Sequence, residues 1–337
     1  MEVFVLKIIA YGIRNDEMPY LKEWEQKNPE VEVKVETKLL DSSTVEEANG
    51  FDGVVAYQQK PYTKEILDKL GSFNIKYLSL RNVGVDNVDA DAAKANGITV
   101  TNVPAYSPNA IAELAITEIM RLLRNTKRFE DKQRSGDLRW APEIGQELNS
   151  KTVGVFGTGR IGHVLVDICR GFGAKVIAYD PFRNPELEKQ GIYVDTPDDL
   201  YKQADIISLH APAVKENEHM VNDKTLSEMK DGSYIINAAR GSLIDTDALI
   251  KALDSGKLAG AALDTYESEV GVFNVNFDSF DDISDDRLKN LMSRDNVLIT
   301  PHIAFYTETA VRNMVTLSLD ANRDLINTGK SDKIVKL

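Results

Sequence analysis

The chain contains a single cysteine, Cys169, and only four histidines among its 337 residues. One cysteine cannot form an internal disulfide, and the scattered histidines give no zinc-type spacing, so no bound metal is expected. This cysteine usage favours a reducing compartment, the cytoplasm, and Cys169 is expected to be a small buried hydrophobic residue.

Long apolar runs and an excess of basic residues are also missing. No run approaches the roughly 20 apolar residues that a membrane span requires, and the short stretch Val3–Leu6 ends at Lys7 without a basic segment before it. The chain has 40 Lys and Arg residues and 53 Asp and Glu residues, which gives a net charge of -13. The sequence therefore predicts neither export nor a membrane span. Because the negative field of the protein repels a phosphate backbone, no nucleic-acid partner is expected either.

The remaining composition is that of an ordinary globular protein, with 42% hydrophobic and 28% charged residues. A chain of 337 residues suggests two domains. Short runs rich in β-branched residues alternate with helical patterns, which indicates parallel sheets covered on both faces. The expected strands form two series: Ile8–Ile13, Val31–Val35, Gly53–Tyr57, Tyr77–Leu80 and Ile98–Thr101, then Val153–Phe156, Val176–Tyr179, Ile206–Leu209, Tyr234–Asn237, Ala259–Leu263 and Val297–Ile299.

Helices are predicted at Glu17–Gln26 and Thr63–Leu70, with Gly71 and Gly97 as stop signals. A longer helix begins at Ser107-Pro108, and a last one runs from Thr307 to near Gly329. Nothing after Thr300 resembles a new domain, so the last helix is expected to return to the first unit.

A dinucleotide fingerprint follows the first strand of the second series. The sequence Gly157-Thr-Gly159-Arg-Ile-Gly162 stands between a strand and an amphipathic segment. In this context the first glycine permits the turn, the second lets the backbone approach a pyrophosphate, and the third lets helix and strand pack closely. Arg160 either pairs with the pyrophosphate or is a surface arginine.

Asp180 lies 18 residues after Gly162, where an acidic residue accepts hydrogen bonds from the adenosine ribose. A carboxylate there opposes a 2'-phosphate, so NAD is favoured over NADP. Arg183 leaves the alternative open, because its guanidinium could accept the extra phosphate or lie in solvent.

Three ionisable residues come just after predicted strands: Arg240, Glu269 and His302. Ligands of open α/β sheets bind beyond the carboxyl ends of the strands, so these side chains can converge. A guanidinium can bind a carboxylate through two hydrogen bonds, and a cationic imidazole can deliver the proton that accompanies a hydride. Glu269, if hydrogen-bonded to His302, would favour the charged imidazole. The set suits reduction of a 2-keto acid, although each residue alone also reads as an ordinary surface or strand-end residue.

The sequence resembles the D-2-hydroxyacid dehydrogenase family, and within it the D-lactate dehydrogenases of lactic acid bacteria. The resemblance covers essentially the whole chain. It is carried by these motifs: Arg81-Asn-Val-Gly-Val-Asp86, Asn102-Val-Pro-Ala-Tyr-Ser-Pro-Asn-Ala-Ile-Ala-Glu113, Gly157-Thr-Gly-Arg-Ile-Gly162, Asn237-Ala-Ala-Arg-Gly241, Asp264-Thr-Tyr-Glu-Ser-Glu269 and Thr300-Pro-His-Ile-Ala-Phe-Tyr306. Two of them depart from the family pattern, since Arg160 stands where the family often has His, and Ala239 where it often has Ser or Thr.

The resemblance implies an α/β fold of two doubly wound parallel-sheet domains, with a Rossmann NAD-binding domain (103–301) inserted in a flavodoxin-like substrate-binding domain (1–102 plus 302–337). It implies a homodimer built through the NAD-binding domain and a D product. It also makes His302 the acid/base, Glu269 its orienting residue, and Arg240 the carboxylate anchor. Substrate contacts are implied at Tyr57, Val83, Gly84, Tyr106 and Phe305, and NAD contacts at Gly157, Gly159, Arg160, Ile161, Gly162, Asp180, Ala211, Pro212, Asn217, Ala238, Ala239, Arg240 and Asp264.

Tyr57 matches a position where relatives that act on branched 2-keto acids carry a smaller aliphatic residue. A large ring there favours pyruvate, unless Tyr57 only packs between a strand and a helix. Two other functions remain open: a D-2-hydroxyisocaproate dehydrogenase acting on larger 2-keto acids, and an NAD-sensing corepressor-like binding protein.

Overall fold

The computed structural model describes residues 5–337 and divides the chain into two compact units. The first consists of the chain up to Ser107 together with Tyr306–Leu337, and the second is Pro108–Phe305. The second unit is therefore inserted in the chain of the first. The domain limits expected at 102/103 and 301/302 fall within five residues of these joins.

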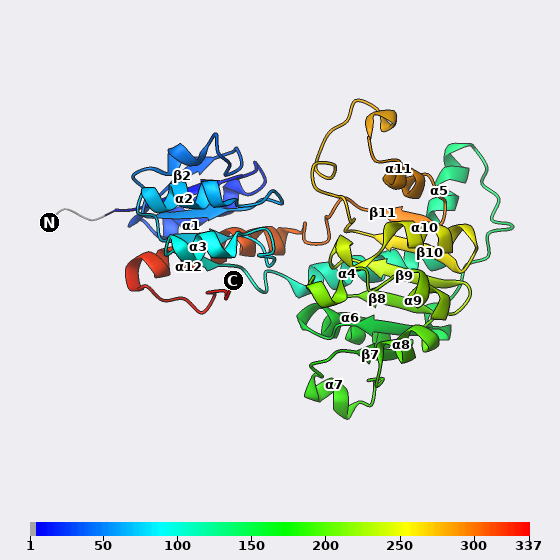
Figure 1. Ribbon diagram of the computed structural model, residues 1–337. Helices are drawn as coiled ribbons and strands as arrows, with labels where there is room; N and C mark the ends of the chain where they lie inside the picture. Colours follow the sequence, from blue (N-terminus) through cyan, green and yellow to red (C-terminus); the bar gives the residue numbers. More distant parts are fainter. Residues whose placement is uncertain (1–4) are drawn as a thin grey trace. The chain divides into compact units, whose positions relative to one another are not determined.

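The first unit is a parallel sheet of five strands in the order β2-β1-β3-β4-β5, the flavodoxin-like order. Helices α1 and α12 bury apolar side chains on one face of this sheet, and α2 and α3 do so on the other. Figure 1 shows the red α12 beside the blue and cyan elements, as expected for a returning last helix. The elements are β1 (Leu6–Tyr11), α1 (Met18–Lys27), β2 (Val31–Glu36), β3 (Gly53–Ala56), α2 (Lys64–Ser72), β4 (Tyr77–Leu80), α3 (Ala90–Ala95), β5 (Thr99–Thr101) and α12 (Glu308–Thr328).

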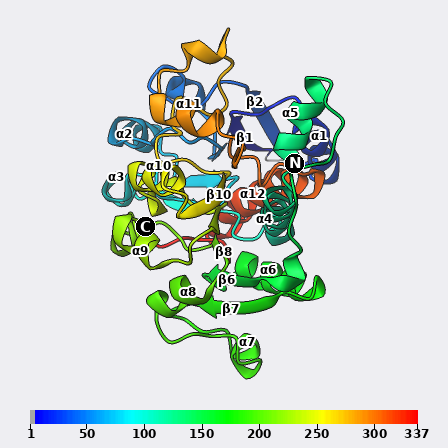
Figure 2. The ribbon, with the colours of Figure 1, turned by 90° about the vertical axis from the view of Figure 1, so that its right-hand side faces the viewer.

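The second unit is a six-stranded parallel sheet in the order β11-β10-β9-β8-β6-β7. Figure 2 shows α4 and α6 together on one side of β6 and β8, with α9 and α10 on the other. This is the doubly wound arrangement predicted for a Rossmann unit. The elements are α4 (Pro108–Leu123), α5 (Thr126–Arg134), β6 (Thr152–Phe156), α6 (Arg160–Gly171), β7 (Lys175–Tyr179), α7 (Pro185–Lys189), α8 (Pro197–Gln203), β8 (Ile206–Leu209), α9 (Asp223–Glu228), β9 (Ser233–Asn237), α10 (Thr246–Asp254), β10 (Leu258–Leu263), α11 (Asp286–Met292) and β11 (Val297–Ile299).

Two local predictions were wrong. The first strand ends at Tyr11 rather than Ile13, because Gly12 adopts a φ of +64° and takes the chain out of the sheet. Gly71 does not stop α2, which continues to Ser72; a Cβ at Gly71 would lie 2.4 Å from the Asn96 side chain, so this glycine serves close packing. The burial predicted for Cys169 is confirmed.

Each sheet has one point where the strand order reverses. In the first unit it lies between β1 and β3, and in the second between β6 and β8. Ligands of open α/β sheets bind beyond the carboxyl ends of the strands at this point. The loops after β1, β3, β6 and β8 are therefore the first places to look for a site.

Candidate functional site

The turn between β6 and α6 has the geometry that a pyrophosphate needs. Gly157 has a φ of +91°, and a Cβ there would lie 2.8 Å from the backbone of His210. A Cβ at Gly162 would lie 1.9 Å from the carbonyl oxygen of Gly157, whereas a Cβ at Gly159 would meet nothing within 4 Å. Thus Gly157 and Gly162 permit close packing, and Gly159 leaves open space at the N-terminus of α6, where an anion is favoured. The three glycines fit a dinucleotide.

Asp180 follows β7 and is hydrogen-bonded to the glycine turn. Its Oδ2 accepts hydrogen bonds from the backbone N of Thr158 at 2.7 Å and from the hydroxyl of Thr158 at 3.2 Å. Its Oδ1 accepts one from the backbone N of Phe182 at 2.8 Å. The carboxylate predicted to meet the ribose is thereby held beside the turn predicted to meet the pyrophosphate.

The other predicted cofactor residues lie at the same carboxyl edge. Ala211 and Pro212 follow β8, and the side chain of Asn217 donates a hydrogen bond to the carbonyl oxygen of Pro212 at 2.6 Å. Ala238, Ala239 and Arg240 follow β9, where Asn237 donates to the carbonyl oxygen of Arg240 at 2.9 Å. Arg160 is exposed and Ile161 half-buried in the first turn of α6. Asparagine side chains therefore fix the backbone of two loops that the sequence assigned to the cofactor.

His302 and Glu269 form the predicted pair. The Nδ1 atom of His302 lies 2.7 Å from Oε1 of Glu269, and Oε2 of Glu269 accepts a hydrogen bond from the backbone N of Tyr266 at 3.0 Å. Because a carboxylate accepts hydrogen bonds, this contact places a proton on Nδ1, so Glu269 is bound through Nδ1 and not through Nε2. The pair has the arrangement of a histidine acid/base with an orienting carboxylate.

The loop that carries His302 is held by Asp264. One carboxylate oxygen of Asp264 accepts hydrogen bonds from the hydroxyl of Thr300 at 2.6 Å and the backbone N of Ile303 at 2.8 Å, and the other accepts one from Ala304 N at 2.9 Å. Burial raises the pKa of this carboxyl group, while these hydrogen bonds act in the opposite direction. His302 itself has a φ of +55°, an uncommon backbone conformation that the surrounding bonds must maintain. Sequence reasoning assigned Asp264 to the cofactor and missed this positioning role.

The loops after β9 and β10 are packed backbone to backbone. A Cβ at Gly241 would lie 2.1 Å from the carbonyl carbon of Tyr266, so only glycine permits this approach. Arg240 directly precedes this contact, and its Nη1 donates a hydrogen bond to the carbonyl oxygen of Ala239 at 2.8 Å. The close approach brings the segments that carry Arg240 and Glu269 together in the second unit. Phe305, a predicted substrate residue, is the last residue of that unit.

The remaining predicted substrate residues belong to the first unit. Tyr57 directly follows β3, at the point where the strand order reverses. Val83 and Gly84 lie in the loop after β4, whose shape is fixed by hydrogen bonds from Asn102 to Val83 O and from Asn82 to Gly84 O, both 2.6 Å. The carbonyl oxygen of Tyr106 accepts a hydrogen bond from Asn313 of α12 at 2.6 Å.

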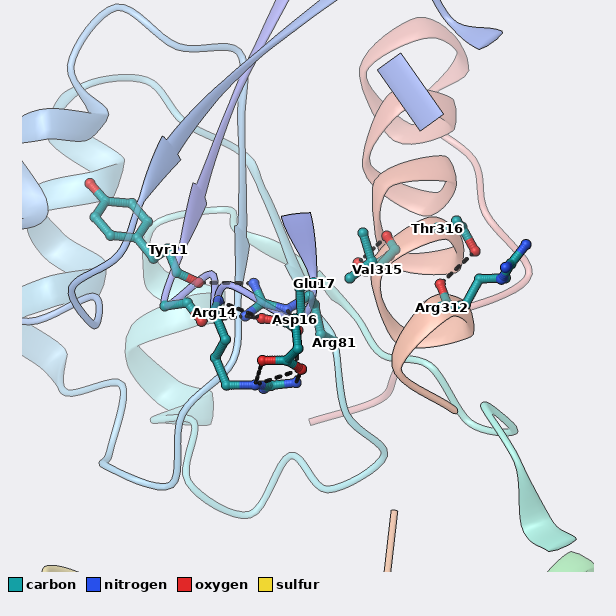
Figure 3. Close-up of polar contacts among 10 residues, drawn as sticks. Tyr11, Arg14, Asp16, Glu17, Arg81, Arg312, Val315 and Thr316 are labelled. Atoms are coloured by element: carbon teal, nitrogen blue, oxygen red, sulfur yellow. Dashed lines mark hydrogen bonds and ion pairs between the residues drawn. The ribbon is translucent and has the colours of Figure 1, made fainter. Parts of the chain in front are cut away.

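A buried ion pair lies beneath this part of the first unit. Arg81 and Glu17 are both fully buried, and their side chains approach to 3.2 Å (Figure 3). Arg81 also donates hydrogen bonds to the carbonyl oxygens of Tyr11 and Gly12 at 2.9 and 2.8 Å. The guanidinium groups of Arg14 and Arg81 each lie 5.8 Å from the centre of the Tyr57 ring. Arg81 therefore joins the loops after β1, β3 and β4.

Removing one partner of this pair is expected to destabilise the first unit. Arg81→Met should lower the free energy of unfolding by about 3 kcal/mol, because it leaves the Glu17 carboxylate buried with only Arg14, at 3.4 Å, as a charged partner. Urea denaturation measures the change. The control is Lys64→Met, which removes an exposed ion pair with Asp68 from the same unit and should leave the transition unchanged. An equal response of the two variants would contradict this role of Arg81.

Within residues 5–337, no group of three or more His, Cys, Asp and Glu side chains could hold a metal ion. No helix of the same described part is long and apolar enough to cross a membrane.

The glycine turn, Asp180 and the His302–Glu269 pair define a doubly wound dinucleotide-binding protein with a histidine–carboxylate pair in the same unit. Residues 116–304 match the model of the D-isomer specific 2-hydroxyacid dehydrogenase NAD binding domain. The chain belongs to the D-2-hydroxyacid dehydrogenase family.

Curated relatives and solved structures agree with this assignment. The chain is 60% identical over 332 residues to a D-lactate/D-glycerate dehydrogenase of Pediococcus acidilactici, covering 98% of this chain and 99% of the relative. It is 59% identical over 331 residues to the D-lactate dehydrogenase of Lactiplantibacillus plantarum, with the same coverage. The structure of a D-2-hydroxyisocaproate dehydrogenase superposes with a TM-score of 0.87 at 43% identity, covering 98% of this chain and 99% of that one.

Proposed function

We propose that the protein is an NAD-dependent D-lactate dehydrogenase that reduces pyruvate reversibly to D-lactate. The observation that carries the proposal is the 2.7 Å contact between His302 and Glu269, next to a loop that ends at Arg240. The identities of 59% to a D-lactate dehydrogenase and 60% to a D-lactate/D-glycerate dehydrogenase support pyruvate over a bulkier keto acid.

In this mechanism the chain binds and protonates the keto acid. NADH, when bound along the glycine turn, supplies a hydride for C2 of the substrate. Arg240 binds the carboxylate through its planar guanidinium. The backbone amides of Val83 and Gly84 are also assigned to the substrate. His302, protonated at both ring nitrogens, gives its Nε2 proton to the ketone oxygen, and Glu269 stabilises the imidazolium through Nδ1. The products are D-lactate, NAD and neutral His302.

The other residues predicted from the sequence complete this proposal. Tyr57, Tyr106 and Phe305 are each assigned a contact with the substrate. The cofactor would contact the three glycines, the backbone of Arg160 and Ile161, the carboxylate of Asp180, and the loops at 211–217 and 238–240. Asp264 would act through the His302 loop that it holds, and its side-chain oxygens already accept three hydrogen bonds there.

A steady-state assay tests the function. The protein with NADH should turn over pyruvate with a higher kcat/KM than phenylpyruvate or 2-ketoisocaproate, and chiral analysis should find D-lactate. A preference for 2-ketoisocaproate would indicate a D-2-hydroxyisocaproate dehydrogenase instead. NADH binding without turnover of any keto acid would indicate a binding protein of the corepressor type.

Tyr57 is expected to limit the size of the substrate side chain. Tyr57→Val should move the ratio of kcat/KM values for 2-ketoisocaproate and pyruvate toward the larger acid by about 10- to 200-fold, because it opens space for the extra methyl groups. The control is Tyr77→Val at the start of β4 in the same unit. If the two variants leave the ratio equally unchanged, Tyr57 only packs between strand and helix.

We also propose a homodimer in the cytosol. Leu138, Trp140 and Ile144, which follow α5 in the second unit, are 81, 82 and 87% exposed, and such a group of large apolar side chains suits a protein partner. The single, buried cysteine suits a reducing compartment. Sedimentation equilibrium should give twice the chain mass of 37.5 kDa; a monomer would rule the dimer out.

A further inference from the structure

A chain of hydrogen bonds connects Asp180 to Tyr193, a residue that sequence reasoning did not single out. The Tyr193 hydroxyl lies 2.6 Å from the hydroxyl of Thr158, which lies 3.2 Å from Oδ2 of Asp180. The backbone N of Asn184 donates to the Tyr193 hydroxyl at 2.8 Å. Four residues from three loops thus share one polar cluster, named the Tyr193 cluster: Thr158, Asp180, Asn184 and Tyr193.

The proton positions in the Tyr193 cluster follow from the chemistry of its members. An ionised carboxylate can only accept hydrogen bonds, so the Thr158 hydroxyl donates its hydrogen bond to Asp180. The Thr158 oxygen then accepts from Tyr193, whose own oxygen accepts from Asn184 N. Every hydrogen bond runs in one direction and ends on the carboxylate. The Tyr193 hydroxyl is therefore committed to orienting Thr158 toward Asp180.

The Tyr193 ring has a second neighbour, Arg183. The guanidinium carbon of Arg183 lies 5.4 Å from the ring centre, within the range of a cation-π contact. Arg183 also pairs with Asp195 at 3.1 Å and with Glu188 at 3.6 Å, and donates to the carbonyl oxygen of Val194. The arginine that could accept a 2'-phosphate is thus engaged by a ring and two carboxylates.

The fold of this segment does not depend on the Tyr193 hydroxyl. Backbone hydrogen bonds join Ala178 N to Ile192 O at 2.8 Å and Val194 N to Ala178 O at 2.9 Å, on either side of Tyr193. The segment is therefore anchored to β7 by its main chain. A phenylalanine at 193 keeps these bonds and the ring, and removes only the link to Thr158.

We propose that Tyr193 is a positioning residue that selects NAD over NADP. Its hydroxyl, through Thr158, fixes the Asp180 carboxylate where it accepts hydrogen bonds from a 2'-hydroxyl. Its ring, with Asp195 and Glu188, keeps Arg183 from pairing with a 2'-phosphate. The inference rests on the proposed function, since it requires the site to bind a nicotinamide dinucleotide.

Direct binding tests the proposal without catalysis. The dissociation constants of NADH and NADPH are measured by nucleotide fluorescence on the full-length protein. Tyr193→Phe should weaken NADH binding about 10-fold, the loss expected for one hydrogen bond that supports a charged group, and should leave NADPH binding unchanged. Tyr193→Leu, which also removes the ring, should in addition strengthen NADPH binding, and Arg183→Ala in that background should cancel the gain.

Two controls separate positioning from simple destabilisation. Tyr234→Phe removes a comparable tyrosine hydrogen bond, 2.8 Å to Gln146, in the same unit and should change neither dissociation constant. Thr158→Val breaks the chain at its middle, so adding Tyr193→Phe to it should cost nothing further.

The outcomes are distinct. Loss of NADH affinity in Tyr193→Phe with unchanged NADPH affinity supports the proposal. Equal weakening of both nucleotides, or wild-type affinities, overturns it while leaving the proposed function intact. Failure of the wild-type protein to bind NADH overturns the proposed function, and the inference with it.

Discussion

Replacing His302 with glutamine is expected to lower kcat for pyruvate reduction by about 10²- to 10⁴-fold, the usual contribution of a general acid. Glutamine can still contact Glu269 but cannot carry a proton to the ketone oxygen at neutral pH. NADH binding, followed by nucleotide fluorescence, should remain near the wild-type strength, because no atom of the glycine turn changes.

The backbone at this position calls for a second variant. His302 has a φ of +55°, which asparagine tolerates better than most residues do. His302→Asn should therefore retain the thermal stability of the protein while showing the same loss of kcat. Near-normal kcat in either variant would remove His302 from the acid role.

The second large effect is expected at Arg240. Arg240→Lys keeps the positive charge but loses the planar pair of donors, so the KM for pyruvate should rise by roughly 10- to 100-fold, as expected for one lost charge-assisted hydrogen bond. Because the same residue was also predicted to contact the cofactor, the dissociation constant of NADH is measured alongside the KM.

A matched substitution completes that experiment. Arg134→Lys makes the same substitution at an exposed arginine of α5 that pairs with Asp131 in the same unit. This variant should leave the KM for pyruvate unchanged. A wild-type KM in Arg240→Lys would refute the carboxylate anchor. A rise in the NADH dissociation constant alone would reassign Arg240 to the cofactor.

Local sequence predicted what depends on neighbours along the chain. The glycine turn was predicted because its spacing encodes a strand, a turn and a helix in one stretch. The helix α12 was predicted from Thr307 to Gly329, and both ends are confirmed: the Thr307 side chain caps it, and Gly329 closes it at a φ of +68°. His302 and Glu269 were expected to converge from the edge they share, the resemblance made Glu269 the orienting residue, and their contact joins residues 33 positions apart.

The contacts that escaped prediction are those that a side chain of one loop makes with another loop. Thr158 meets Tyr193 across 35 positions, and Asp264 meets Ala304 across 40. The spacing of residues along the sequence does not indicate such pairs, because each partner alone is an ordinary loop residue. The acidic stretch from Asp278 to Asp286 illustrates this: within it, Asp285 caps α11 and accepts a hydrogen bond from the Tyr266 hydroxyl. The five-residue helix α7 also fell below the length that a helical pattern needs.

The insertion of one unit in the chain of the other has a consequence for biosynthesis. During translation, all of Pro108–Phe305 emerges from the ribosome before any part of α12 does. The second unit can therefore fold first, because synthesis from the N-terminus to the C-terminus completes it before the first unit. Until then only α1 covers the sheet face that also receives Val315 and Leu319, and the side chain of Asn322 cannot yet donate to Val54 and Ser79. The first unit begins the chain, but it is the last to be finished.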